Sequence, residues 1–193
     1  MDDMVRQAMA KWPDVPNCYG WLALDRRGQW RVRNEYAQQH GLSGDPIRHD
    51  AMVAFIERNY LRDANGAWFF QNGPQRVFVS LGYAPWVVRL HAGRFTTTSQ
   101  RAFDVRGCHV DEHGNVLLTG KVDREPAGSG EQAALLHDHD LADFSSACTW
   151  HGEACGASLG VFHHAEGDIE IEPIAEDEVA KRFRFVREPV ARA

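Results

Sequence analysis

The 193-residue sequence is poor in cysteine, and its four cysteines are scattered along a chain too large to need disulfide staples. We therefore expect buried free thiols. No apolar run approaches the roughly 18 residues that a membrane-spanning helix requires. The first residues, MDDMVRQAMAKW, contain two acids where a signal peptide is basic, and no apolar stretch follows them. These absences predict a soluble, cytoplasmic protein.

Basic charge is also in short supply, because 21 lysines and arginines stand against 27 acids, for a net charge of −6. Nucleic-acid phosphates need a basic surface, so this balance argues against nucleic acid as a partner. The chain has no Gly-x-Ser-x-Gly elbow, no Walker loop and no Gly-x-Gly-x-x-Gly after a strand. We therefore expect a protein without a cofactor, and we prefer a non-catalytic protein to an enzyme.

A pattern of Asp-x-x-Gly between apolar runs recurs along the chain. The aspartate can accept hydrogen bonds from the backbone two residues on, which begins a type I turn. The glycine then supplies the positive φ angle that such a turn needs when it closes a hairpin with a bulge. A looser copy contains Gly167. The pattern predicts three tight hairpins, whose turns carry Asp25 and Gly28, Asp63 and Gly66, and Asp111 and Gly114.

Four other segments have apolar residues at helical spacing, namely 4–12, 45–60, 138–150 and a last one that begins near residue 176. Pro13 forbids continuation of the first. The last segment begins acidic and turns basic, which is the charge order that the helix dipole favours. Aspartates are candidate N-caps for the two middle helices: Asp45 or Asp50, and Asp138 or Asp140.

The order of hairpin, helix and hairpin occurs twice. Residues 19–34, 46–60 and 60–72 form the first set, and residues 105–119, 138–149 and 157–172 form the second. We predict an α+β fold of antiparallel hairpins and sheets with packed helices, and an internal duplication is one explanation of the repeat. Coincidence is the other, because Asp-x-x-Gly turns are common.

The expected organisation has three parts. An N-terminal helix occupies residues 1–17, a first hairpin-helix-sheet unit occupies 18–92, and a second, related unit with a C-terminal helix occupies 93–193. The polar stretch 120–133 is the best candidate for a linker.

Six short motifs follow one another over about residues 18–92: Gly28 and Trp30, Pro46 to Arg48, Phe55, Asp63 to Trp68, Pro74 to Val77, and Ala84 to Val87. In this order they resemble uncharacterised bacterial families known only as domains of unknown function, and residues 31–44 look like an insertion. The resemblance implies a mixed α+β fold built from repeated hairpin-helix units and a link to signalling, and it carries no catalytic motif.

The stretch WFFQNGPQRVFV, residues 68–79, places polar side chains beside aromatic ones. Asn72-Gly73-Pro74 is turn chemistry, so a simple hairpin connection is the first interpretation. The second is a binding site for an anionic or planar group, since arginine is always charged and stacks on rings. The candidate ligand-binding residues are Arg48, Gln71, Asn72, Gln75, Arg76 and Trp86.

The histidines supply the alternative function. Imidazole and carboxylate groups are ligands for zinc, iron or manganese, and LLHDHDL gathers His137, Asp138, His139 and Asp140. A metal-dependent hydrolase using this cluster is the alternative to a non-catalytic regulatory domain that binds a small molecule or a protein. The i, i+4 histidine pair of helical zinc sites is absent.

Opposed charge blocks stand near the C-terminus, with seven acids in residues 166–178 and five basic residues in 181–192. They can pair within the fold or across a homodimer. Pairing within the fold is the preferred interpretation.

Overall fold

The computed structural model describes residues 1–123, 130–152 and 158–191, and the statements below concern these residues. The chain forms two compact units, of which the first combines Met1–Tyr83 with Arg184–Ala193 and the second is Ala84–Phe183. The division therefore differs from the one expected after residue 92, because the strands that follow Tyr83 pair only within the second unit. No described helix is long and apolar enough to cross a membrane.

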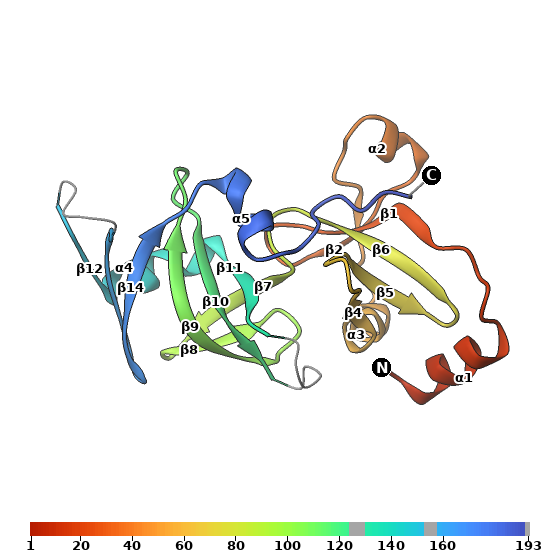
Figure 1. The fold of residues 1–193 in the computed structure, drawn as a ribbon, viewed down its shortest axis with the longest axis horizontal. Helices are drawn as coiled ribbons and strands as arrows, with labels where there is room; N and C mark the ends of the chain where they lie inside the picture. The colour runs from red at the N-terminus through yellow and green to blue at the C-terminus, as the bar shows by residue number, and fades with distance from the viewer. Residues whose placement is uncertain (124–129, 153–157, 192–193) are drawn as a thin grey trace. The chain divides into compact units, whose positions relative to one another are not determined.

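The first unit holds a six-stranded sheet in the order β3-β2-β1-β6-β5-β4 (Figure 1). Its central pair, β1 and β6, is parallel, and every other pair is antiparallel. The elements are α1 (Asp3–Lys11), β1 (Cys18–Leu24), β2 (Trp30–Val32), α2 (Glu35–Gln39), β3 (Asp45–Pro46), α3 (Asp50–Arg58), β4 (Tyr60–Arg62), β5 (Trp68–Asn72) and β6 (Gln75–Leu81).

Both faces of this sheet are covered around β5 and β6. On one face, α3 contributes Ile56, which is fully buried, and Phe55, whose ring meets Phe70 edge-on at 5.3 Å. On the other face, Phe69 and Phe78 form a small apolar cluster, against which Val186 of the C-terminal segment packs. The alternation of Val77 and Phe78 along β6 therefore does not separate an inner from an outer face.

The second unit closes part of its sheet into a barrel. Its eight strands run in the order β10-β11-β7-β8-β9-β14-β13-β12, and an additional pairing of β9 with β10 closes the first five. The elements are β7 (Trp86–His91), β8 (Arg94–Thr97), β9 (Ala102–Val110), β10 (Val116–Val122), β11 (Gln132–Leu136), the 3₁₀ turn η1 (Asp138–Asp140), α4 (Leu141–Ser146), β12 (Cys148–Trp150), β13 (Gly160–His164), β14 (Gly167–Pro173) and α5 (Glu176–Arg182).

The α+β class predicted from the sequence is confirmed, and so are the three hairpin turns. Gly28, Gly66 and Gly114 have φ angles of 75°, 86° and 79°. The Oδ1 atom of Asp25 accepts hydrogen bonds from the backbone amides of Arg27 and Gln29, both at 2.9 Å. Asp63 and Asp111 make the same pair of bonds to amides two and four residues on.

The helices occur within the segments that periodicity indicated, but their ends differ. The segment 138–150 is helical only as far as Ser146, and Cys148–Trp150 is strand β12. The side chains that accept a backbone hydrogen bond at the helix starts are His49, from Met52 at 3.3 Å, and His137, from His139 at 3.1 Å. Asp50 lies inside α3 and is not its cap. Asp140 holds the expected N-cap position of α4, but its carboxylate makes no cap hydrogen bond and binds Arg89 instead.

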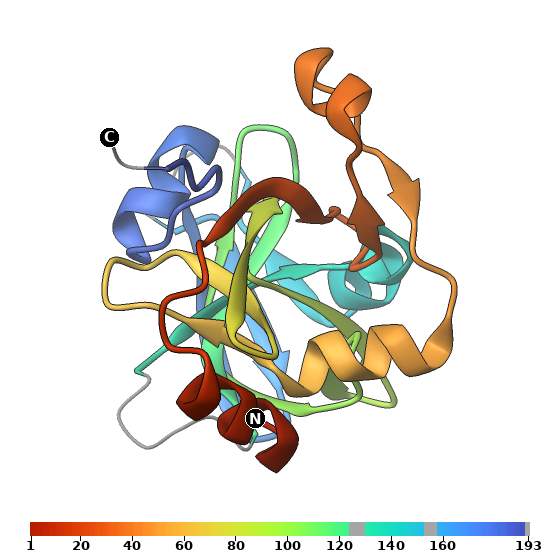
Figure 2. The same cartoon turned by 90° about the vertical axis from the view of Figure 1, so that its right-hand side faces the viewer.

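The stretch 31–44, which resembled an insertion, contains α2. This five-residue helix stands out from the sheet of the first unit in both ribbon views (Figure 2). Its N-cap Asn34 accepts a hydrogen bond from the Ala37 amide at 2.9 Å, and Tyr36 is exposed and stacked on His40. The helix therefore adds apolar surface without contributing to the core, apart from Ala37.

The strand pairings of the first unit recur within the second. The antiparallel neighbours β3-β2-β1 correspond to β11-β10-β9, and the neighbours β6-β5-β4 correspond to β14-β13-β12. The single parallel pair also recurs, since β1 joins β6 and β9 joins β14. Helix α3 lies between β3 and β4 in the chain, and α4 lies between β11 and β12. The second unit thus contains the pattern of the first plus the inserted hairpin β7–β8.

The correspondence holds residue by residue. Leu24 faces Trp30 before the Asp25 turn, and Val110 faces Val116 at the matching place before the Asp111 turn. The pair of Tyr60 with Phe70 has its counterpart in Cys148 with Phe162. Backbone hydrogen bonds in the loops match as well. The Gln71 amide donates to the Asn59 carbonyl, and the His163 amide donates to the Ala147 carbonyl, both at 2.9 Å.

Candidate ligand-binding pocket

The polar residues singled out by sequence lie at the β5–β6 hairpin of the first unit. Gln71 faces Arg76 and Asn72 faces Gln75 across it, with Gly73 in the left-handed region at φ 56°. Gln71 is buried at 1% exposure, and its Nε2 atom donates to the Gly73 carbonyl at 2.9 Å. This glutamine therefore builds the turn and is not a free donor.

The remaining members of that set are unequal. The Gln75 side chain donates to the Pro16 carbonyl at 3.1 Å, so its amide is also engaged. Arg76 is exposed, and its guanidinium carbon lies 4.8 Å from the centre of the Phe69 ring. Asn72 and Arg48 are exposed as well. The hairpin interpretation of this stretch thus accounts for the two glutamines, and a role for the two arginines stays a prediction.

Trp86, the last of the candidate ligand-binding residues, is not a surface residue. It lies on β7 of the second unit, is 5% exposed, and has the Arg101 guanidinium carbon 5.2 Å from its ring centre. Its indole is therefore buried within the second unit.

The histidine–aspartate cluster 137–140 is organised as a helix start. The His137 ring caps η1, and its Nδ1 atom lies 2.9 Å from Asp138 Oδ1. Asp140 binds Arg89 Nε at 2.6 Å and the Leu90 amide at 2.9 Å, and the bond to Arg89 lowers the pKa of its carboxyl. Within the described parts of the chain, no three His, Cys, Asp or Glu side chains form a group able to hold a metal ion. The structure gives the metal-hydrolase alternative no support.

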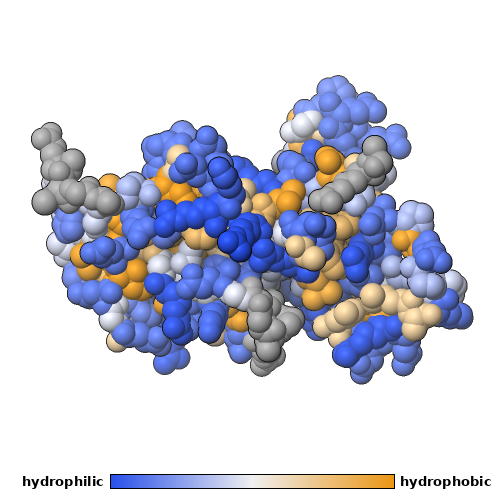
Figure 3. Space-filling view, viewed as in Figure 1, coloured by the Kyte–Doolittle hydropathy of each residue, from blue (hydrophilic) through white to orange (hydrophobic). Residues whose placement is uncertain are grey.

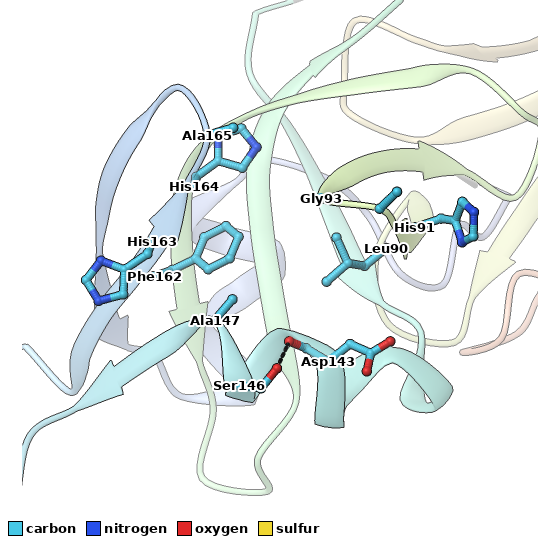
Figure 4. A pocket seen from close by; sticks show the side chains of 11 residues that line it. Leu90, His91, Gly93, Asp143, Ser146, Ala147, Phe162, His163, His164 and Ala165 are labelled. Atoms are coloured by element: carbon cyan, nitrogen blue, oxygen red, sulfur yellow. Dashed lines mark hydrogen bonds between the residues drawn. The ribbon is translucent and has the colours of Figure 1, made fainter.

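A cavity of about 610 Å³ lies instead in the second unit, between the β7–β8 turn, the end of α4 and strand β13 (Figure 4). The side chains of Leu90, Ala147 and Phe162 form an apolar slot, and the His164 ring stands at one end. Asp143 and Ser146 of α4 line the opposite end.

The wall of the slot is aromatic and rigidly packed. The Phe162 ring is buried and lies 4.8 Å from Phe144 and 5.9 Å from Phe95, measured between ring centres. His164 packs on the same group, with its ring centre 5.6 Å from that of Phe162. Because Phe144 and Phe95 hold Phe162 from behind, the wall is preformed.

The polar groups at the slot differ in the hydrogen bonds that they already make. Nδ1 of His164 accepts a long hydrogen bond of 3.4 Å from the Glu166 amide, which makes Nε2 the protonated nitrogen in the neutral ring. The Ser146 hydroxyl donates to the Asp143 carbonyl at 2.8 Å. Asp143 is exposed at the rim. The slot thus offers one imidazole N–H donor and one carboxylate around an apolar floor.

The neighbouring His163 points away from the slot (Figure 4). Its Nδ1 atom lies 3.0 Å from Asp168 Oδ1, and its Nε2 atom lies 2.8 Å from the Thr149 hydroxyl. All three side chains are exposed on the other face of the sheet. The two adjacent histidines thus differ, since His163 is exposed and the His164 ring is half-buried.

Sequence reasoning missed the slot as a whole. Its parts come from residues near 90, 146 and 163, and no local pattern links them. The one available signal was the apolar residue next to a histidine pair in Phe162-His163-His164, where alternation along a strand puts Phe162 and His164 on one face.

The structure is that of a two-unit α+β protein with a cavity of about 610 Å³ in its second unit. Over residues 1–190 the chain matches the family described as "Protein of unknown function (DUF2946)", and it belongs to that family. The prediction of an uncharacterised domain family is therefore confirmed. The match extends over the second half, which the sequence resemblance did not cover.

Two solved structures are similar to the chain. One is a DUF1285 family protein from Silicibacter pomeroyi DSS-3, with 14% identity, a TM-score of 0.48, and coverage of 93% of this chain and 98% of that chain. The other is a DUF1285 family protein from Shewanella baltica OS155, with 12% identity, a TM-score of 0.42, and coverage of 65% and 91%. No curated protein matches the chain.

Proposed function

We propose that this protein is a non-catalytic regulatory domain of the cytoplasm that binds a small, mainly apolar molecule in the slot beside His164. The observation that carries the proposal is the cavity of about 610 Å³, in which Leu90, Ala147 and Phe162 form an apolar floor between polar side chains at its ends. Small-molecule sites in proteins typically measure roughly 300–1,000 Å³ and combine apolar surface with placed polar groups.

The lining supports binding better than catalysis. A hydroxyl nucleophile needs a base within hydrogen-bond reach, but the Ser146 hydroxyl donates to a backbone carbonyl. His164 faces a slot of aromatic and aliphatic carbon. An imidazole N–H in such surroundings orients a ligand by donating a hydrogen bond to its carbonyl, carboxylate or phenolate oxygen.

The shape of the slot favours a flat ligand. Leu90 stands across from Phe162 and Ala147, so a planar ring fits between them. Offset stacking of a ring on Phe162 adds to the apolar burial. We therefore propose an aromatic or heteroaromatic ligand with one oxygen acceptor. Such a ligand would link the inserted β7–β8 hairpin to α4, which is a simple route to regulation.

The test is a screen of aromatic carboxylic acids and phenols by thermal shift, followed by titration of the best binder. His164→Ala is expected to weaken binding about tenfold, because it removes one hydrogen bond worth about 1 kcal/mol. Ala147→Leu is expected to abolish binding by filling the slot. His163→Ala is the matched control, since its ring lies on the opposite face, and it is expected to leave the affinity unchanged.

Two results would reject this function. Equal losses from His163→Ala and His164→Ala would show that the ligand does not lie in the slot. Full binding by Ala147→Leu would do the same, provided that this variant melts cooperatively.

We also propose that the two matched regions descend from one duplicated hairpin-helix-hairpin unit. The support is the repeated strand order, including the single parallel pair in each region. Superposing residues 18–83 on the matching residues of 102–175 tests it. Helices α3 and α4 in unrelated positions would defeat the duplication.

A further inference from the structure

In the first unit, a groove beside the Asp25 turn is filled by the chain's own C-terminal segment, residues 184–188. Val186 forms a parallel bridge with Ala67, and its amide donates to the Gly66 carbonyl at 3.1 Å. The Leu81 amide donates to the Arg187 carbonyl at 2.8 Å. The segment is therefore held as an extended strand by backbone hydrogen bonds.

Arg187 is the polar anchor of this segment. Its guanidinium donates to the Gly82 carbonyl at 2.8 Å, and its central carbon lies 5.8 Å from the Tyr83 ring centre. Val186 packs on the cluster of Ala67, Phe69 and Phe78. The occupant thus combines an apolar residue with a basic residue directly after it.

The strand correspondence identifies the matching groove in the second unit. The amide of Gly82 donates to the Leu24 carbonyl at 2.8 Å, and the amide of Ile174 donates to the Val110 carbonyl at 3.1 Å. In the same way, the backbone amide of Asp63 donates to the Ala67 carbonyl, and the backbone amide of His151 donates to the Leu159 carbonyl. Leu159, Pro173, Ile174 and Ala175 therefore stand where Ala67, Leu81, Gly82 and Tyr83 meet the C-terminal segment in the first unit.

At this place the second unit has an open cavity of about 470 Å³. Leu159, Pro173 and Ile174 give it an apolar wall, and apolar surface is visible beside the hydrophilic β9–β10 turn (Figure 3). Leu159 is 37% exposed, which is unusual for a leucine next to a sheet core. The second unit thus keeps the groove and lacks an occupant from the described parts of the chain.

The rim of this cavity is acidic. Glu112 and Glu178 line it, and Glu112 takes the position that Arg26 holds in the first unit, one residue after the aspartate of the turn. Glu112 Oε2 accepts a hydrogen bond from the Glu176 amide at 3.0 Å, which fixes this carboxylate beside the cavity. A cationic side chain anchored where Arg187 lies in the first unit would meet these two carboxylates.

We propose that this groove docks an extended segment of a partner protein that carries an apolar residue followed by arginine or lysine. The filled groove of the first unit supplies the binding mode, and the carboxylates supply the preference for positive charge. Pro173 replaces Leu81 and cannot donate its backbone nitrogen, so one backbone hydrogen bond of the first groove has no counterpart. The acidic rim therefore carries more of the affinity here.

The experiment uses the full-length protein and a fluorescein-labelled peptide with the sequence of residues 184–189, Arg-Phe-Val-Arg-Glu-Pro. Fluorescence polarisation at low and high salt is expected to show binding that weakens as salt rises. Glu178→Lys is expected to weaken binding about tenfold, as charge reversal at an interface rim does. Leu159→Ser tests the apolar wall and is expected to weaken binding without a change in its salt dependence.

The matched control is Glu166→Lys, which makes the same change in net charge at the far end of the β13–β14 hairpin. Binding by this variant is expected to remain within about twofold of the parent, because exposed charges farther apart than the Debye length interact weakly. Equal losses from Glu166→Lys and Glu178→Lys would overturn the proposal, as would no binding at millimolar peptide.

Self-association is the remaining outcome that decides the occupant. A dimer in analytical ultracentrifugation that Glu178→Lys dissolves would make the occupant a second copy of this chain, and would overturn the assignment to a partner protein. The small-molecule slot beside His164 lies on other elements, so failure of either proposal leaves the other testable.

Discussion

The two matched regions share their strand pairing, yet they differ in the length of the helix on the sheet and in whether the groove beside the first turn is filled. In the first, α3 is a nine-residue helix that places Ile56 on the sheet, and the C-terminal segment fills the groove beside the Asp25 turn. In the second, α4 is six residues long, and the corresponding groove beside the Asp111 turn is open. With the same strand pairing, the groove is therefore filled in the first region and open in the second.

The inserted hairpin β7–β8 explains the other difference. It pairs with β11 and β9, closes the barrel, and brings Leu90 opposite Phe162 to form the slot. It also brings Arg89 to Asp140. The first unit has no such hairpin among its described strands, and it has Met52 at the position corresponding to Asp140. The slot thus lies where the second unit has one hairpin more than the strand pattern that it shares with the first.

The largest expected effect tests whether α3 and α4 contribute similarly to stability through the side chain that each buries against its sheet. Ile56 and Phe144 hold the same place, since each accepts the helix-end hydrogen bond, from Asn59 and from Ala147. Both side chains are buried, at 0% and 1% exposure. We expect Phe144→Ala to lower the free energy of unfolding by about 4 kcal/mol and Ile56→Ala by about 3 kcal/mol.

Urea unfolding followed by tryptophan fluorescence measures both changes. Met52→Ala is the control, because Met52 lies on α3 but is 40% exposed, and we expect less than about 1 kcal/mol. A loss at Ile56 or Phe144 no larger than that at Met52 would mean that the helix concerned is not held on its sheet by this residue.

The second effect separates two turns that share the Asp-x-x-Gly pattern. A Cβ atom at Gly66 would stand 2.3 Å from the Arg184 carbonyl oxygen, whereas one at Gly114 would meet no atom within 4 Å. We expect Gly66→Ala to destabilise by about 3 kcal/mol, and Gly114→Ala by about 1 kcal/mol from its positive φ angle alone. Thermal melts of the two variants give the comparison. Equal losses would show that the C-terminal segment does not press on Gly66.

A smaller, pH-dependent effect belongs to the second unit alone. The hydrogen bond from Arg89 lowers the pKa of Asp140. A lowered folded-state pKa contributes stability above the unfolded aspartate pKa of about 4, and this contribution is lost as the pH falls through the folded-state value. Because Arg89 is half-exposed, we expect Asp140→Asn to cost about 1 kcal/mol at pH 7.

The measurement is the free energy of unfolding of the parent and Asp140→Asn between pH 7 and pH 2. Their difference is expected to shrink below pH 4. A difference that stays constant with pH would mean that the Asp140 charge is not what ties α4 to β7.

The smallest effect concerns the arginines of the first unit. Arg76 is exposed at a strand end, so Arg76→Ala is expected to change stability by less than about 0.5 kcal/mol. If these residues bind a ligand, the same variant weakens that binding, and Arg48→Ala does so in parallel. Large unfolding by Arg76→Ala would make the arginine part of the architecture.

Local chemistry explains which features the sequence could predict. Each Asp-x-x-Gly turn is determined by hydrogen bonds that span at most four residues. The hairpins at Asp25, Asp63 and Asp111 can therefore be predicted from the local sequence. Helices were placed by periodicity, but their starts were not, because the histidine side chains of His49 and His137 act as caps in place of the aspartates beside them.

Exposure was harder to predict than secondary structure. Gln71 is polar and was expected at a surface, yet the tertiary fold buries it over the turn that it holds together. Trp86 was expected beside a ligand, but the barrel closes around it. A strand pattern does not state whether its second face meets water or another layer.

The sequence by itself determined the α+β class, the three turns and the order of hairpins and helices, because these depend on neighbouring residues. Only the tertiary structure decided where a ligand can bind. The slot joins Leu90, Ser146 and His164, and the open groove joins Glu112, Leu159 and Glu178. Residues so far apart in the chain become neighbours through strand pairing, whose partners no short stretch of sequence specifies.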